Sequence, residues 1–336
     1  AERSARAAGA RTLLIDDRFA GTTCATVGCM PSKLLIAAAK AAHDVERASV
    51  FGIDVPGYRV DGAAVMARVR AKRDEFVAGA LRSIDDVPDD HKIRARARFV
   101  DPTTLMLDDG RRVVARAVVI ATGARPQVPE PFEALGELVL TNETIFELAD
   151  LPASIAVVGA GPLGLELAQA LARLGVEVSL FNRTRKLAGL RDDAVAEVVK
   201  GIVARDMALH LGVKIEPRRE GGRAVLCWHG DDGAGGEQAF DRVLVAAGRL
   251  PNLEGLDLHA AGVDLDERGV PHFDRRTMQC ASTAVFIAGD ADADVPVLHE
   301  ASDEGAIAGS NAARWPEMTR TARSVPFAVT FTDPPI

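Results

Sequence analysis

Residues 155–181 read IAVVGAGPLGLELAQALARLGVEVSLF and constrain the fold of this chain more than any other segment. The first four residues are apolar and predict a buried strand. A G-x-G-x-x-G turn follows, formed by Gly159, Gly161 and Gly164. The next ten residues have helical apolar periodicity, Gly175 is placed to end the helix, and an alternating second strand completes the segment. This order predicts a βαβ unit that holds a dinucleotide pyrophosphate at the helix N-terminus, with a purely structural turn as the alternative.

Residues 2–16 repeat the second half of that pattern: a helix, then Gly9, a short strand and Asp16. Gly9 precedes Asp16 by seven positions, as Gly175 precedes Asn182. We therefore expect a second dinucleotide unit whose first strand and glycine-rich turn lie outside this sequence. Asp16 is predicted to accept hydrogen bonds from the ribose of the first nucleotide.

The turn after the second strand of residues 155–181 is basic. Asn182 stands where an acid would bind a ribose, and Arg183, Arg185 and Lys186 follow. Positive side chains there can pair with a 2′-phosphate, which predicts that NADP(H) is tolerated or preferred. A solvated basic turn is the alternative.

Cys24 and Cys29 stand in C-x4-C spacing at the start of an apolar helix, and Lys33 follows them. A helix N-terminus and a nearby lysine both stabilise a thiolate, so the pair is predicted to be redox-active. A zinc site is the first alternative, but His43 is the nearest histidine and the other cysteines are isolated. An inert buried pair is the second.

The 336 residues carry a formal net charge of −8, which argues against nucleic-acid binding through a basic face. The hydrophobic content of 48% supports two or three folded domains. No apolar run is long enough to predict a membrane helix, the first residues do not resemble a signal peptide, and four cysteines are too few for a disulfide framework. We expect a cytoplasmic protein that binds neither membrane, nucleic acid nor a metal ion.

Four further segments are informative together: GTTCATVGCMPSK, VVIATGARPQVP, VLVAAGRLPN and VFIAGDADADVPVLHEASDEG. In this order they resemble the flavoprotein disulfide reductases, the family of dihydrolipoamide dehydrogenase, glutathione reductase and mercuric reductase. The linker TNETIFELADLP and the MPSK sequence bring the chain closest to the dihydrolipoamide dehydrogenase branch.

The resemblance implies roles for individual residues. Cys24 would exchange with the substrate, and Cys29 would face the flavin as a thiolate. Lys33 would lie beside flavin N5 and pair with Glu166. The remaining residues implied to contact the cofactors are Thr23, Thr122, Gly123, Gly248, Asp290 and His299. Cys227 and Cys280 match no functional position and are expected to be ordinary small apolar residues.

The resemblance also implies an α/β fold with two Rossmann-like FAD/NAD(P)-binding domains of three-layer ββα architecture, the second inserted into the first. The expected boundaries are 1–150 for the FAD domain and linker, 151–274 for the NAD(P) domain, 275–323 for a returning FAD segment and 324–336 for the start of an interface domain. The FAD glycine motif, the dimerisation domain and its acid–base His–Glu pair are expected to lie outside this sequence. We therefore expect this stretch by itself to bind FAD poorly and to show no turnover.

The implied activity is transfer of electrons between NAD(P)(H), FAD and the Cys24–Cys29 pair. The substrate would be a small dithiol or disulfide or a lipoyl protein, and the complete protein would be a homodimer. Mercuric-reductase-like and glutathione-reductase-like enzymes are alternatives, as is a non-catalytic nucleotide-binding relative.

Overall fold

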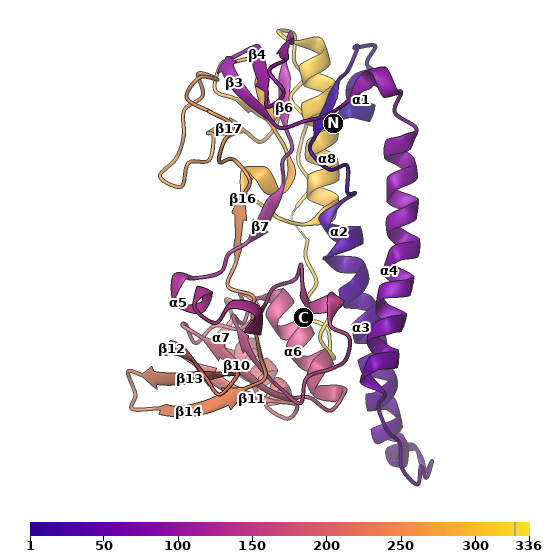
Figure 1. Ribbon diagram of the computed structural model, residues 1–336, viewed down its shortest axis with the longest axis vertical. Helices are drawn as coiled ribbons and strands as arrows, with labels where there is room; N and C mark the ends of the chain where they lie inside the picture. The colour runs from indigo at the N-terminus through magenta and orange to yellow at the C-terminus, as the bar shows by residue number, and fades with distance from the viewer. Residues whose placement is uncertain (326) are drawn as a thin grey trace. The chain divides into compact units, whose positions relative to one another are not determined.

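The computed structural model describes residues 1–325 and 327–336 (Figure 1), and they fall into two units. Unit 1 contains residues 1–20, 81–125 and 249–328. Unit 2 contains residues 21–80, 126–248 and 329–336. The long segment 126–248 is therefore inserted in sequence between two parts of unit 1.

A parallel sheet with strand order β11-β10-β9-β15-β8 forms the centre of unit 2. Helix α6 (Pro162–Arg173) connects β9 to β10, so the βαβ unit predicted for residues 155–181 is present. The strands are β8 (Val139–Leu140), β9 (Ser154–Val158), β10 (Glu177–Asn182), β11 (Ala208–Leu211) and β15 (Arg242–Val245).

The central strand β9 is buried on both faces, and alternate residues pack into different layers. Ile155 and Val157 belong to the core that α6 shares with the long helices α3 (Cys29–Glu46) and α4 (Gly62–Asp85). Ala156 and Val158 belong to the core beneath an antiparallel sheet of β12 (Val213–Glu220), β13 (Arg223–Gly230) and β14 (Gly235–Phe240). Unit 2 thus has two sheets and a helical layer.

The other elements of unit 2 lie mainly in its connections. They are α2 (Thr23–Thr26), η1 (Ala48–Phe51), α5 (Glu130–Glu133), η3 (Gly136–Leu138), η4 (Ile145–Glu147) and α7 (Asp193–Val203). β13 and β14 pair antiparallel and are joined by a short glycine-containing turn, so they form a hairpin.

Unit 1 also has two layers of sheet and one of helix. Phe286 of β19 (Val285–Ile287) packs with α8 (Leu298–Arg314). Val285 and Ile287 instead pack toward Phe99 of the antiparallel sheet of β3 (Ala97–Asp101), β4 (Thr104–Leu107) and β5 (Arg112–Val114). The helices are α1 (Glu2–Ala7), η2 (Asp89–His91), η5 (Gly289–Asp292) and α8 (Leu298–Arg314). The strands are β1 (Leu14–Asp16), β2 (Lys92–Arg94), β3 (Ala97–Asp101), β4 (Thr104–Leu107), β5 (Arg112–Val114), β6 (Val118–Ile120), β16 (Arg249–Pro251), β17 (Phe273–Asp274), β18 (Gln279–Cys280) and β19 (Val285–Ile287), and β7 (Ala124–Pro126) crosses the boundary.

Candidate active site

The junction between α2 and α3 presents the two cysteines of the C-x4-C motif. A Cβ atom at Gly28 would lie 2.8 Å from the carbonyl oxygen of Thr23, so this tight junction needs glycine. The buried Asn142 donates a side-chain hydrogen bond of 3.0 Å to the carbonyl of Val27. These contacts hold the chain so that α3 begins at Cys29.

Cys24 and Cys29 are free thiols that contact each other. The neighbouring Cys24 thiol and the Lys33 charge lower the pKa of Cys29 to about 6, against the opposing effect of partial desolvation. The same interaction with Cys29 raises the pKa of Cys24 above its usual range. Of the two thiols, Cys29 is therefore the one that ionises first.

We expect Cys29 to titrate as a thiolate with a midpoint near pH 6 in the reduced protein. Its thiolate is then present at neutral pH and is lost as the pH falls through that midpoint. The measurement is the ultraviolet absorbance of the thiolate against pH, taken as a difference from Cys29→Ser. A midpoint near the ordinary value of about 8.5 would contradict the assignment.

Lys33 and Glu166 form an ion pair between α3 and α6. Lys33 Nζ lies 2.6 Å from Glu166 Oε2, and the side chains are 33% and 6% exposed. Burial of the carboxylate requires a partner for its charge, and Lys33 supplies it. The sequence-based expectation that these residues pair agrees with this geometry.

Phe331 makes two further contacts with this ion pair. Its backbone N–H donates to Glu166 Oε1 at 2.8 Å, and Lys33 Nζ lies 4.2 Å from the centroid of its ring. The sequence alone places Phe331 only at the expected start of an interface domain. A backbone donor 165 positions from its acceptor leaves no signal in the sequence.

The three glycines of the β9–α6 turn have distinct surroundings. Gly159 has φ +113°, and a Cβ atom there would lie 2.3 Å from the Ala246 carbonyl oxygen. A Cβ atom at Gly164 would lie 2.0 Å from the Gly159 carbonyl oxygen, which explains the close approach of α6 to β9. A Cβ atom at Gly161 would have no described neighbouring atom within 4 Å. An open approach to the N-terminus of α6 fits a dinucleotide pyrophosphate.

The basic turn after β10 is organised by Asn182. Its amide donates 3.0 Å hydrogen bonds to carbonyls of the same turn, including that of Lys186. Arg185 pairs with Asp232 at 2.5 Å, whereas no salt bridge involves Arg183 among the residues described. Of the two arginines, Arg183 has the side chain whose charge is not already paired.

Most of the other predicted contacts lie at or just after strand ends, and one lies on a helix. In unit 1, Asp16 ends β1 and accepts 2.7 and 2.6 Å hydrogen bonds from two N–H groups of the following turn. The carbonyls of Thr122 and Gly123 accept hydrogen bonds from Asn252. In unit 2, Gly248 has φ +126°, and Thr23 is the first residue of α2.

Asp290 and His299 lie near the C-terminal part of unit 1. Asp290 Oδ2 is 3.4 Å from Arg249 Nε, a buried atom without a hydrogen-bond partner among the residues described. His299 is exposed on α8. The unpaired Arg249 donor beside Asp290 fits a polar ligand such as the ribityl–pyrophosphate part of FAD. Arg249 was missed in the sequence analysis, although it directly follows Gly248.

The two remaining cysteines differ from each other. Cys280 is fully buried, as expected for a small apolar residue, and burial raises its pKa to about 12. Cys227 does not fit the same expectation, because its sulfur lies 2.8 Å from Arg218 and 2.9 Å from Glu237. The register of β12, β13 and β14 places these three side chains together.

Comparison with known proteins identifies the family. The family model described as "Pyridine nucleotide-disulphide oxidoreductase" matches residues 1–305. The chain belongs to this family. Mycothione reductase of Mycobacterium tuberculosis is 32% identical to it, over 98% of this chain and 73% of the relative.

Other relatives in the pyridine nucleotide-disulphide oxidoreductase family act on different substrates, as their names indicate. Dihydrolipoyl dehydrogenase of Bacillus subtilis is 29% identical, over 92% of this chain and 68% of the relative. Mercuric reductase of Staphylococcus aureus is also 29% identical, over 98% of this chain and 60% of the relative. The chain thus spans about 60% to 73% of the length of these relatives.

The flavoprotein disulfide reductase RclA of Escherichia coli, solved as a Cu(II) complex, has a similar fold. It aligns with a TM-score of 0.80 at 22% identity, covering 99% of this chain and 73% of the RclA chain. The predicted α/β class with Rossmann-like FAD/NAD(P)-binding domains is confirmed. Members of this family use FAD and NAD(P)H. In the part of the chain that the structure describes, no helix is both long and apolar enough to cross a membrane.

Proposed function

We propose that the complete protein is an FAD-dependent dithiol–disulfide oxidoreductase that uses NAD(P)(H) and the Cys24–Cys29 pair. The observation that carries this proposal is the placement of Cys29, a neighbour of Cys24 with a lowered pKa, at the start of α3 beside the Lys33–Glu166 ion pair. Family membership supports it. An inert pair of buried cysteines would need neither a lowered Cys29 pKa nor an exposed Cys29 side chain.

Each cysteine has a separate role in the proposed thiol–disulfide exchange. Cys24 loses its proton to a base and attacks a substrate disulfide, which breaks the substrate S–S bond and forms a mixed disulfide. The Cys29 thiolate then attacks the Cys24 sulfur, releases the second substrate thiol and leaves the Cys24–Cys29 disulfide oxidised by two electrons. FAD, when bound, passes two electrons between NAD(P)(H) and this pair. The reverse sequence oxidises a dithiol substrate.

We propose a dihydrolipoyl group, free or protein-bound, as the leading substrate. The MPSK sequence after Cys29 and the TNETIFELADLP linker support it, as does the similarity to dihydrolipoyl dehydrogenase. A homodimer in the cytoplasm, with the acid–base pair supplied by an interface domain, completes the proposal.

The decisive experiment is an anaerobic titration of the complete protein with NADH and, separately, NADPH, followed by visible absorbance. Reduction should produce a long-wavelength thiolate–flavin band that is absent from Cys29→Ser. Flavin bleaching without that band would mean that the cysteines are not coupled to the flavin. A protein without a flavin spectrum would favour a non-catalytic nucleotide-binding role.

Arg183 is the residue we expect to bind the 2′-phosphate of NADP(H). Losing one charge-assisted contact in Arg183→Glu should lower kcat/KM for NADPH by about tenfold or more, with a much smaller change for NADH. Arg205→Glu is the matched control, since it makes the same charge change on the exposed surface after α7. Equal losses with both nucleotides in Arg183→Glu would count against this role.

A further inference from the structure

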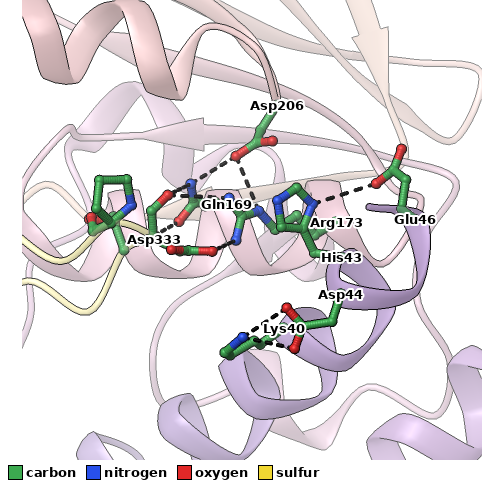
Figure 2. Close-up of polar contacts among 10 residues, drawn as sticks. Lys40, His43, Asp44, Glu46, Gln169, Arg173, Asp206 and Asp333 are labelled. Atoms are coloured by element: carbon green, nitrogen blue, oxygen red, sulfur yellow. Dashed lines mark hydrogen bonds and ion pairs between the residues drawn. The ribbon is translucent and has the colours of Figure 1, made fainter. Parts of the chain in front are cut away.

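Asp333 is attached to one side of α6 by contacts with Gln169 and Arg173 (Figure 2). Gln169 accepts a 2.8 Å hydrogen bond from the Asp333 N–H and donates one of 3.1 Å to the Asp333 carbonyl. Arg173 Nη1 lies 2.8 Å from Asp333 Oδ2. Both α6 side chains also contact the carboxylate of Asp206, which orients them toward Asp333.

The anchoring residues lie on the same side of α6 as Glu166. Positions 166, 169 and 173 are spaced by three and four residues, so their side chains form one stripe along the helix. Gln169 is 4% exposed and the Arg173 side chain 8%, whereas the carboxylate side chain of Asp333 is 48% exposed. The attachment therefore rests on the buried α6 side chains and on the two Gln169 hydrogen bonds to the Asp333 backbone. Phe331 lies two residues before Asp333. The attachment of Asp333 therefore brings the Phe331 N–H to Glu166 Oε1 and the Phe331 ring to Lys33.

We propose that residues 330–333 form a positioning segment for the Lys33–Glu166 pair, with Phe331 as the positioning residue and Asp333 as its anchor. The inference extends the proposed function, because it assigns this segment a role in setting the thiolate at Cys29.

Both contacts of Phe331 restrict the ion pair. A carboxylate that is 6% exposed needs donors for both oxygens, and Lys33 occupies Oε2 while the Phe331 N–H occupies Oε1. The aromatic ring gives the ammonium group a second favourable contact that fixes its direction.

The position of Lys33 affects the ionisation of Cys29. The groups that act on the Cys29 sulfur are the Cys24 thiol and Lys33, which favour the thiolate, and the Glu166 carboxylate, which opposes it. Freed from Phe331, Lys33 would become mobile and act less strongly on Cys29. The segment therefore stabilises the Cys29 thiolate through Lys33.

The test is the pH titration of the Cys29 thiolate in the complete, reduced, FAD-loaded protein, read as ultraviolet absorbance against Cys29→Ser. Asp333→Ala, which releases the anchor, should raise the midpoint by about 0.5 pH unit. Phe331→Leu, which keeps the N–H and removes the ring, should give a smaller rise in the same direction. Lys33→Met is the positive control and should give the largest rise.

Glu137→Ala is the matched negative control, because it removes an exposed ion pair with Arg219 elsewhere in unit 2. Thermal melts of all variants separate a local effect from unfolding. A shift in Lys33→Met with no shift in folded Asp333→Ala and Phe331→Leu would overturn this inference and leave the proposed function standing. Absence of the thiolate–flavin band from the unmutated protein would instead count against the proposed function, whatever the titration midpoints.

Discussion

Replacing either Cys24 or Cys29 by serine will abolish disulfide turnover, with an expected loss on the order of 10⁴-fold, as for other groups that act as one catalytic unit. Each step of the proposed exchange uses one sulfur as nucleophile and the other as its partner, and a serine oxygen can replace neither. NAD(P)H should still reduce the flavin, because the nucleotide turn at α6 is intact. The measurements are steady-state turnover with a disulfide or dithiol substrate and anaerobic flavin reduction.

The two serine variants differ in a way that tests the assignment of roles. Cys24→Ser keeps Cys29 and should retain a thiolate–flavin band, whereas Cys29→Ser should lose it. Cys227→Ser is the control, because Cys227 lies on β13 among Arg218 and Glu237. Substantial turnover by Cys24→Ser would exclude Cys24 as the exchanging sulfur.

Gly164→Ala should strongly destabilise the nucleotide turn. The new Cβ atom would lie 2.0 Å from the Gly159 carbonyl oxygen and 3.1 Å from its carbon, and a backbone group cannot swing aside as a flexible side chain can. We expect unit 2 to lose about 3 kcal/mol of unfolding free energy as α6 moves away from β9. Denaturant unfolding and NAD(P)H affinity measure the two consequences.

Gly161→Ala is the matched comparison within the same turn. Gly161 has φ −72° and ψ 176°, which alanine readily adopts, and nothing lies within 4 Å of the added atom. Stability should stay within about 0.5 kcal/mol of the unmutated protein. Affinity for NAD(P)H should fall by about tenfold, because the methyl group occupies the space where a pyrophosphate approaches. Unchanged affinity would mean that the nucleotide does not approach Gly161.

The β9–α6–β10 unit could be predicted from sequence because its signals are local. The apolar strand, the glycine spacing and the helical periodicity of residues 155–181 each reflect neighbouring positions, and the structure has the elements in that order. The Lys33–Glu166 pairing is not a local signal. It was expected only through the family resemblance, and the 2.6 Å contact agrees with it.

The contacts of Phe331 and Cys227 could not be predicted in the same way. Phe331 acts through a backbone N–H, which every residue except proline carries, so its identity reveals nothing about the bond to Glu166. Cys227 looked like a small apolar residue because its polar neighbours come from β12 and β14, through strand register. The expected domain boundaries and site roles remain predictions.

The shared core of α3 and α6 links the cysteine pair to the nucleotide turn thermodynamically. Leu35 and Ala39 of α3 pack in one cluster with Leu165 and Leu171 of α6, so neither helix can open without exposing the other. A nucleotide that binds the folded turn raises the free energy of that shared opening. Backbone amides of α3 should therefore exchange with solvent more slowly when NAD(P)H is bound, although the proposed nucleotide site lies at the start of α6. Nucleotide binding at the β9–α6 turn and slow amide exchange in α3 therefore depend on the same opening of the shared core.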